Sequence, residues 1–270
     1  MARLGLADGA HLEYELAGDG PTVTLIHPGL WDMKTWDREV RRFPQAGYRV
    51  LRYDVRGYGR SSRPDPGEPY SHVRDLLELL DAIEVTQTAL VGCSMGGGIA
   101  LDFALEHPER VWALVPVASG LGGFESTESE DEWWAQRDEP IEAAIEAGDL
   151  ERAQALRLEM WAPLGTSDER GARIREIAFD NLHEITLDES GEERLDPPAA
   201  HRLAEIDMPI LILEAEHDPP DMRRTANFLA MEIMGSRKVV VEGADHVVNL
   251  RQPERFDELV LPFLAEAAPR

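Results

Sequence analysis

The stretch TALVGCSMGGG, residues 88–98, is the strongest structural signal in this 270-residue chain. The run TALV predicts a buried strand, and the residues after the glycines predict a helix. Between them lies Gly92-Cys93-Ser94-Met95-Gly96, a G-x-S-x-G pattern. A serine in so sharp a turn exposes its hydroxyl, and glycine two positions away on either side leaves room for the chain. We therefore interpret Ser94 as a nucleophile. Neither G-x-G-x-x-G nor a Gly-Lys-Ser/Thr loop can be read here, which disfavours a phosphate-binding turn.

Other short apolar runs resemble the one before Ser94 and predict further strands. They occupy residues 22–27, 49–53, 111–118, 209–214 and 237–241. Weaker runs at residues 3–6 and 11–16 flank Asp8-Gly9, which suits a hairpin turn. Near-continuous apolar strands are typical of a parallel sheet that is buried on both faces.

Helical patterns separate these strands. Residues 71–83 carry apolar side chains at spacings of three and four, a second pattern runs from Ser94 to His107-Pro108, and a third starts at Pro253. Pro262 is expected to end or kink the third helix. The alternation predicts the α/β class, with a mostly parallel, doubly wound sheet.

Residues 122–204 break this alternation, because they contain no convincing strand. We expect a flexible exit over residues 120–123 and 126–131, then helical stretches at residues 140–147, 150–160 and 169–187. The prediction is a helical cap (122–204) between two parts of the core (1–121 and 205–270). A cap at the carboxyl ends of the strands would lie where such sheets bind ligands. The alternative is a solvated helical excursion with a small core of its own.

Three tryptophans of the cap are predicted substrate contacts, and with them we expect a mainly apolar pocket. They are Trp133, Trp134 and Trp161. Leu30 and Trp31, in the loop after the strand at 22–27, are further candidates.

A serine nucleophile needs a base, and the sequence offers eight histidines. His246 follows the last predicted strand and precedes the last helix, so it should lie at the same sheet edge as Ser94. We expect His11, His72 and His107 to lie away from the strand ends. Asp218, just past the run PILILEAEH, is the predicted acid that orients His246, with Glu214, Glu216 and Asp221 as competitors.

Backbone N–H groups should stabilise the oxyanion of such a reaction. Met95, directly after the nucleophile, is predicted to supply one. The other should come from His27-Pro28-Gly29-Leu30, where Pro28 has no N–H, so the donor is Gly29 or, as an alternative, Leu30. We expect His27 to be a structural hydrogen-bonding residue and Cys93 a packed thiol.

Charge and composition exclude several classes of function. Twenty-seven basic against 52 acidic residues give a net charge of −25, which disfavours nucleic acid and anionic membranes as partners. A single cysteine excludes an internal disulfide framework, and we expect no metal and no cofactor. The first twenty residues lack the apolar core of a signal peptide, so we expect a cytoplasmic protein.

Several motifs together resemble the α/β-hydrolase family of esterases, 3-oxoadipate enol-lactonases and cofactor-free haloperoxidases. They are HPGL with Trp36 nine residues after His27, DVRGYGRS at residues 54–61, GCSMGG, EHD and GADH. The resemblance covers residues 1–120 and 205–270. It implies that DVRGYGRS forms a structural turn beside the active site. Two positions depart from the family, since Pro28 and Asp245 stand where glycine is usual; Asp245 could raise the pKa of His246 or point to solvent.

The resulting hypothesis is a serine hydrolase that cleaves a small-molecule carboxylic ester or lactone through an acyl-enzyme. Alternatives on the same fold are a carbon–carbon bond hydrolase of dienoate ketones, a cofactor-free haloperoxidase or perhydrolase, and a ligand receptor without turnover. A serine at position 94 argues against epoxide hydrolases and haloalkane dehalogenases, which resemble this family but use aspartate there.

Overall fold

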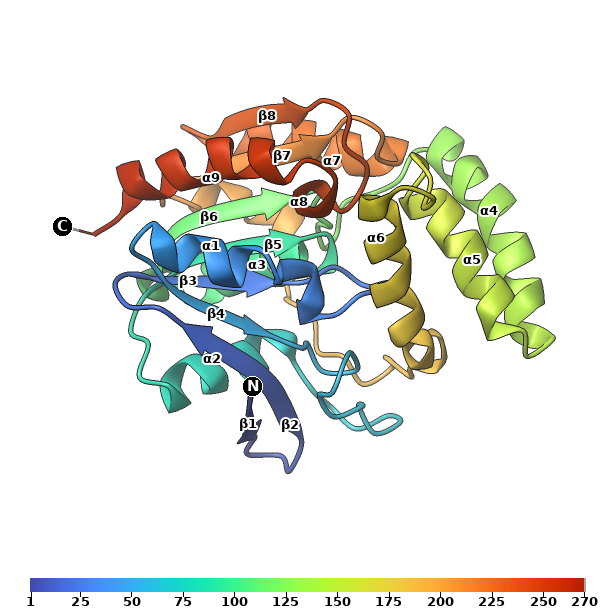
Figure 1. Cartoon of the computed structure of the whole chain (residues 1–270), viewed down its shortest axis with the longest axis horizontal. Coiled ribbons are helices and arrows are strands. Elements are labelled where there is room, and N and C mark those ends of the chain that lie inside the picture. Colours follow the sequence, from blue (N-terminus) through green and yellow to red (C-terminus); the bar gives the residue numbers. More distant parts are fainter. Residues whose placement is uncertain (270) are drawn as a thin grey trace.

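The computed structural model describes residues 1–269 and is built around one eight-stranded sheet (Figure 1). The strands are β1 (Ala2–Gly5), β2 (His11–Ala17), β3 (Thr22–Ile26), β4 (Arg49–Tyr53), β5 (Thr88–Cys93), β6 (Val111–Val117), β7 (Leu211–Ala215) and β8 (Arg237–Val241). Their order across the sheet is β1-β2-β4-β3-β5-β6-β7-β8. The strands from β4 to β8 pair in parallel, whereas β2 is antiparallel to β1 and to β4. The predicted fold class is confirmed.

Helices cover both faces of the sheet. One face carries α2 (His72–Ala82), α3 (Met95–Glu106) and α7 (Pro220–Glu232), and the other carries α1 (Glu39–Gln45), α8 (Val248–Arg251) and α9 (Pro253–Ala267). Successive residues of β3 and β5 alternate between the two cores. The pleat thus explains why these strands read as continuous apolar runs: each side chain faces a helical layer.

The helix α9 continues past Pro262 to Ala267, so the expectation that Pro262 ends the helix is wrong. Proline in a helix interior removes one backbone hydrogen bond. Val260, Phe263 and Leu264 on either side of it are buried in the core against the sheet. Their packing offsets that loss.

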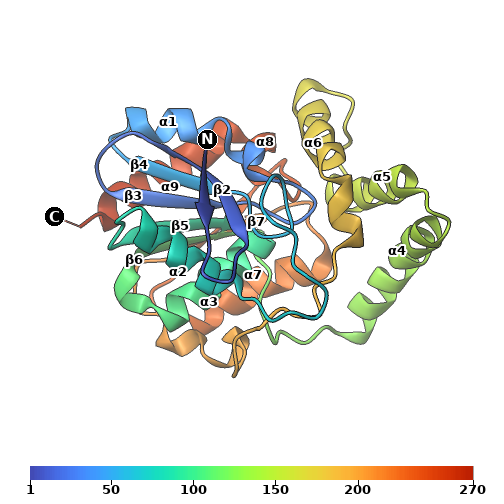
Figure 2. The same ribbon diagram turned by 90° about the horizontal axis from the view of Figure 1, so that it is seen from below.

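Residues 122–204, which we call the insertion, lie between β6 and β7 and contain α4 (Glu128–Glu146), α5 (Leu150–Trp161) and α6 (Glu169–Asp180). Short 3-10 turns follow at Leu182–Thr186, Ala199–His201 and Leu203–Glu205. In both ribbon views α6 lies nearest the strand ends, and α4 and α5 lie farther out (Figures 1 and 2).

The expected flexible exit over residues 126–131 is wrong in the structure. Helix α4 starts at Glu128 because Thr127 and Glu130 form a capping box. The Glu130 carboxylate also pairs with Arg224 of α7, which fixes the start of α4 to the core. The pattern T-x-x-E at residues 127–130 indicates this capping box, but it is hard to recognise because the residues around it are also acidic.

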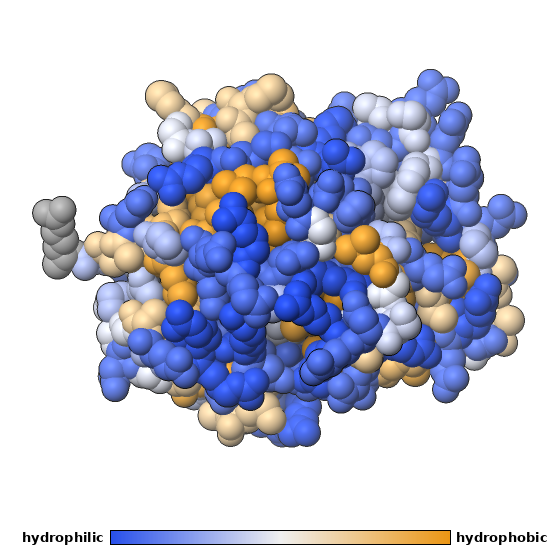
Figure 3. Space-filling view, turned by 45° about the horizontal axis from the view of Figure 1, so that its top comes forward, coloured by the Kyte–Doolittle hydropathy of each residue, from blue (hydrophilic) through white to orange (hydrophobic). Residues whose placement is uncertain are grey.

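The view in Figure 3 shows a largely hydrophilic face, as the acidic composition requires. Large exposed apolar side chains among the described residues are scattered; they are Met1, Leu164, Met231, Met234 and Val240. Within residues 1–269, no helix combines the length and the apolar character that crossing a membrane demands.

Candidate active site

Ser94 occupies the turn between β5 and α3 with φ 53° and ψ −116°, a left-handed conformation that non-glycine residues rarely adopt. Its N–H donates to Val117 O (2.9 Å), and its carbonyl accepts from Gly98 and Gly120 N–H (both 3.0 Å). The backbone is therefore fixed on both sides. The hydroxyl caps nothing and makes no hydrogen bond within residues 1–269, so it is free to react with a ligand.

The glycines around Ser94 are sterically required. A Cβ on Gly92 would collide with the carbonyl of Gly96, and a Cβ on Gly96 would collide with the carbonyls of Ile26 and His27. The turn thus brings β3, β5 and α3 into backbone contact, as the G-x-S-x-G spacing predicts.

His246 and Asp218 meet at the same edge of the sheet. Asp218 lies between β7 and α7, His246 lies between β8 and α8, and both side chains are almost fully buried. The ring Nδ1 of His246 is 2.7 Å from Asp218 Oδ1. A carboxylate only accepts hydrogen bonds, so Nδ1 carries a proton, and in the neutral imidazole the free lone pair is then on Nε2.

The competing acids are engaged elsewhere. Glu214 pairs with Lys238 (2.6 Å) and Arg223, and Glu216 accepts from the N–H of Gly243 (2.8 Å). Asp221 starts α7, and burial raises its pKa. Among the described residues, Asp218 is the carboxylate that hydrogen-bonds to His246.

Aromatic rings and a thiol fix the position of His246. The Trp161 ring of the insertion lies 4.1 Å from the His246 ring between centroids, and Trp31 lies 6.4 Å away. The Cys93 thiol donates to His246 O (3.4 Å) and is fully buried, so it is packed as expected. Burial raises the pKa of this thiol well above its usual range.

Asp245 does not point to solvent. Its carboxylate is fully buried and accepts from Nε of Arg251, with both oxygens at 2.9 Å. Arg251 also donates to Gly165 O in the loop between α5 and α6 (2.5 Å). The pair therefore joins the His246 loop to the insertion, and the charge of Asp245 is balanced by Arg251.

The loop after β3 carries the other predicted backbone donors. Val55 N–H, just after β4, donates to His27 Nε2 (2.9 Å), and this bond ties the loop to β4. Because Nε2 is the acceptor, the ring proton is on Nδ1, which donates to Pro28 O (2.8 Å). Burial lowers the pKa of His27 to about 4 and keeps it neutral. Leu30 is buried with φ 67°, a strained conformation of the kind that concentrates at functional sites. Within residues 1–269, the N–H groups of Gly29 and Met95 have no hydrogen-bond acceptor.

A cavity of about 270 Å³, which we call the Ser94 cavity, brings these groups together. Ser94, Met95, His246 and Gly29 line it, together with the apolar side chains of Leu30, Trp31 and Trp161. Polar and charged residues also line it: Tyr58, His72, Glu189, Glu192 and Arg194. The lining therefore combines apolar and polar side chains.

Trp133 and Trp134 are absent from this lining. Trp134 packs against Trp161 with ring centroids 5.4 Å apart, and Trp133 packs edge-on against Trp134 at 5.0 Å. Of the three tryptophans, Trp161 alone reaches the Ser94 cavity within the described chain. Trp134 packs directly on Trp161, and Trp133 packs on Trp134, so both lie outside the cavity.

The polar lining comes from the return segment of the insertion. Tyr70 N–H donates to Gly191 O (3.0 Å) and Tyr70 O accepts from Glu193 N–H (2.7 Å), which anchors residues 189–194 beside the start of α2. Any side chain on Gly191 would collide with the Glu68 backbone. This close backbone contact places Glu189, Glu192 and Arg194 at the cavity.

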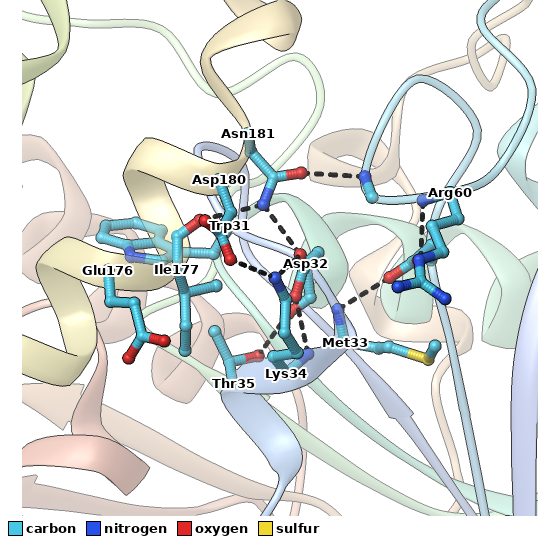
Figure 4. A network of polar contacts seen from close by, with 12 residues as sticks. Trp31, Asp32, Met33, Lys34, Thr35, Arg60, Glu176, Ile177, Asp180 and Asn181 are labelled. Atoms are coloured by element: carbon cyan, nitrogen blue, oxygen red, sulfur yellow. Dashed lines mark hydrogen bonds and ion pairs between the residues drawn. The ribbon is translucent and has the colours of Figure 1, made fainter. Parts of the chain in front are cut away.

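A second set of polar contacts anchors α6 to the loop after β3 (Figure 4). Asn181, fully buried, donates to Asp32 Oδ2 (2.8 Å) and accepts from Gly59 N–H (2.8 Å). Lys34 bridges Asp32 and Asp180. The Trp31 indole N–H donates to Ile174 O (2.9 Å). The loop with Gly29 and Leu30 is thus held from the insertion side as well.

The chain is similar to several known proteins. The chain is 32% identical to rhodomycin D methylesterase of Streptomyces sp. (strain C5), and the alignment covers 86% of each chain. It is 29% identical to a Bacillus subtilis (strain 168) protein provisionally named 2-succinyl-6-hydroxy-2,4-cyclohexadiene-1-carboxylate synthase. That alignment covers 94% of this chain and 95% of the relative. A solved hydrolase of Pseudomonas aeruginosa PA01 aligns with TM-score 0.74, 29% identity and 97% coverage of both chains. The model of the alpha/beta hydrolase fold matches residues 21–143.

The chain belongs to the α/β-hydrolase fold family.

Sequence reasoning missed part of the lining of this α/β hydrolase's cavity. His72 was expected away from the strand ends, but it starts α2 and reaches the Ser94 cavity. Tyr58 lies in the DVRGYGRS turn and was expected only as part of a structural element. Glu189, Glu192 and Arg194 follow no periodic pattern. Only the Gly191 position signals that this segment touches another backbone.

Within residues 1–269 of this α/β hydrolase, no three His, Cys, Asp or Glu side chains are grouped as metal ligands.

Proposed function

We propose that this protein is a serine hydrolase that cleaves a small-molecule carboxylic ester or lactone through an acyl-enzyme. One observation carries the proposal: the imidazole bonded to Asp218 through Nδ1 lines the same cavity as the strained, unbonded Ser94. A nucleophile, a base and an orienting acid in this relation are what acyl transfer needs.

In the first half of the reaction, Ser94 Oγ attacks the acyl carbon while His246 Nε2 takes the hydroxyl proton. The bond to the alcohol oxygen then breaks, and His246 returns the proton to that oxygen. Asp218 stabilises the imidazolium but keeps its own charge. In the second half, water attacks the acyl group with His246 again as the base, and the acid leaves with Ser94 restored.

The N–H groups of Gly29 and Met95 would donate hydrogen bonds to the carbonyl oxygen and stabilise the negative charge that develops on it. Both donors lack another partner within the described chain, and both line the Ser94 cavity. The positive end of α3, which starts at Met95, adds to this stabilisation.

The insertion would act as a cap over the cavity, since Trp161, Glu189, Glu192 and Arg194 all come from it. The methylesterase among the relatives supports ester cleavage as the reaction class. The substrate is then an ester small enough for a cavity of about 270 Å³.

A panel of short esters and lactones, measured with wild type and with Ser94→Ala, tests the proposal. We expect many turnovers by wild type and a loss on the order of 10⁶ in kcat for Ser94→Ala. Ser236→Ala removes a serine hydroxyl far along the chain, between α7 and β8, and should keep full activity. A single turnover by wild type would indicate a receptor, and retained activity in Ser94→Ala would exclude Ser94 as the nucleophile.

A further inference from the structure

Tyr58 is held rigidly in the turn that follows β4. Its N–H donates to Val55 O (2.9 Å), and its carbonyl accepts from Ser61 N–H (3.1 Å). Asp54 fixes the same turn by accepting from the N–H groups of Arg60 (2.9 Å) and Met33 (3.0 Å). The Tyr58 ring packs edge-on against His27, with centroids 5.3 Å apart. The side chain therefore has little freedom to move.

The hydroxyl of Tyr58 faces the Ser94 cavity and has no partner. The residue is only 5% exposed, and within residues 1–269 its Oη makes no hydrogen bond. It shares the lining with Ser94, Met95 and His246. A Cβ on Gly29 would lie 3.6 Å from this Oη, so the hydroxyl is next to the predicted oxyanion loop.

This hydroxyl is accessible from the cavity and has no partner within residues 1–269, so it is available to a bound ligand. Phenylalanine would fill the same space without leaving a polar atom unsatisfied. Burial raises the pKa of the Tyr58 phenol above its usual range, so the group keeps its proton and acts as a donor. Its natural acceptor is an oxygen of a bound ligand.

We propose that Tyr58 is a third donor to the carbonyl oxygen of the substrate, beside the N–H groups of Gly29 and Met95. The inference rests on the proposed function, because the oxygen it serves is the one that becomes negative when Ser94 attacks. Tyr58 keeps its proton throughout; the hydrogen bond shortens as charge develops, and no bond to hydrogen is broken.

Tyr53 provides a matched control. It lies at the end of β4, it is 1% exposed, and its hydroxyl is buried without a partner within the described chain. It does not line the Ser94 cavity. Tyr53→Phe and Tyr58→Phe therefore remove the same atom from two nearly buried tyrosines, and only the Tyr58 side chain lines the cavity.

The experiment compares kcat and KM for a hydrolysed ester in wild type, Tyr58→Phe and Tyr53→Phe. We expect Tyr58→Phe to lose on the order of 10² in kcat, the effect of removing one oxyanion donor, with KM nearly unchanged. Affinity for an alkyl boronic acid, which forms a tetrahedral adduct on a serine nucleophile, should fall by a similar factor. Both variants should keep the wild-type melting temperature, and Tyr53→Phe should keep wild-type kcat.

Wild-type kcat in Tyr58→Phe would overturn the inference, and so would a rise in KM alone, which would indicate ground-state binding. A lower melting temperature in Tyr58→Phe with unchanged boronate affinity would show a structural role and would also overturn it. Failure of the proposed function looks different, because wild type itself would then not turn over esters.

Discussion

The sheet core and the insertion face each other across the Ser94 cavity, and they contribute groups of different kinds. The core supplies Ser94, His246 and the backbone donors, all fixed by backbone hydrogen bonds or buried pairs. The insertion supplies the Trp161 ring and the three charged side chains of Glu189, Glu192 and Arg194. Changes in the core should therefore alter the rate for every substrate, whereas changes in the insertion should alter the ranking of substrates.

The helices of the insertion differ in how firmly they are tied to the core. Helix α6 is tied to the core by Asn181 and Lys34 (Figure 4) and by the Trp31–Ile174 hydrogen bond. Helices α4 and α5 lie farther out (Figure 2) and pack mainly against each other. Helix α6 is thus firmly tied to the core, while Trp161 at the end of α5 is the residue of the insertion whose ring contacts His246.

Asp218→Asn gives the largest expected effect among the supporting residues. An amide at position 218 favours the wrong tautomer of His246, so kcat should fall by about 10⁴ for every ester tested. Asp221→Asn is the control three residues away, and its effect should be far smaller. A reversal of the two effects in steady-state kinetics would show that the acid has been assigned wrongly.

Trp161→Ala should change selectivity. The ring covers one side of the cavity, so its loss should shift the ranking of kcat/KM across an ester series by about 1–3 kcal/mol. Trp133→Ala removes a tryptophan that lies two rings away and should leave the ranking nearly unchanged. Because Trp161 also contacts the His246 ring, a uniform loss of rate with no change in ranking would assign it a positioning role only.

Asn181→Ala tests the link between the insertion and the core. The change leaves the Gly59 N–H without its acceptor and removes a donor from buried Asp32. It should lower the free energy of unfolding by about 1–3 kcal/mol, seen as a lower melting temperature. Asn227→Ala on the exposed side of α7 should change it by less than about 0.5 kcal/mol. Equal melting temperatures for both variants would contradict the described anchoring.

Glu189→Gln has the smallest expected effect. Glu189 has no ion-pair partner within residues 1–269, whereas Glu192 is paired with Arg194 (2.9 Å). An ester with an ammonium group should therefore be preferred over its neutral isostere, and the variant should reduce that preference up to about fivefold at low salt. Glu193→Gln, which removes an acid paired with Arg74 outside this cavity, is the control. If Glu189→Gln keeps the preference for the ammonium ester, that preference is due to another group.

The sheet and the meeting of Asp218 with His246 could be predicted because local signals determine them. Near-continuous apolar runs specify buried parallel strands, and residues just past their carboxyl ends must gather at one edge. A side chain at Gly92 or Gly96 would collide with backbone atoms, so both positions must be glycine. The turn can therefore be recognised in the sequence.

The polar side of the cavity could not be predicted in the same way. Residues 189–194 lie in irregular chain, and they reach the cavity through a short backbone bridge to Tyr70, which has no periodic signature. Tyr58 was placed in a structural turn, but the direction of its hydroxyl depends on how that turn packs on His27 and Gly29. The direction of the Asp245 side chain could not be predicted for a related reason. Its partner Arg251 is recognised only once the position of α8 is known.

The identity of the nucleophile is the central claim, and covalent labelling tests it most directly. The protein is treated with a serine-directed fluorophosphonate and then analysed by intact mass and peptide mapping. The account predicts one adduct per chain, on Ser94, no labelling of Ser94→Ala, and much slower labelling of Asp218→Asn. Labelling of Ser94→Ala at the wild-type rate, or an adduct mapped to any other residue, would contradict it.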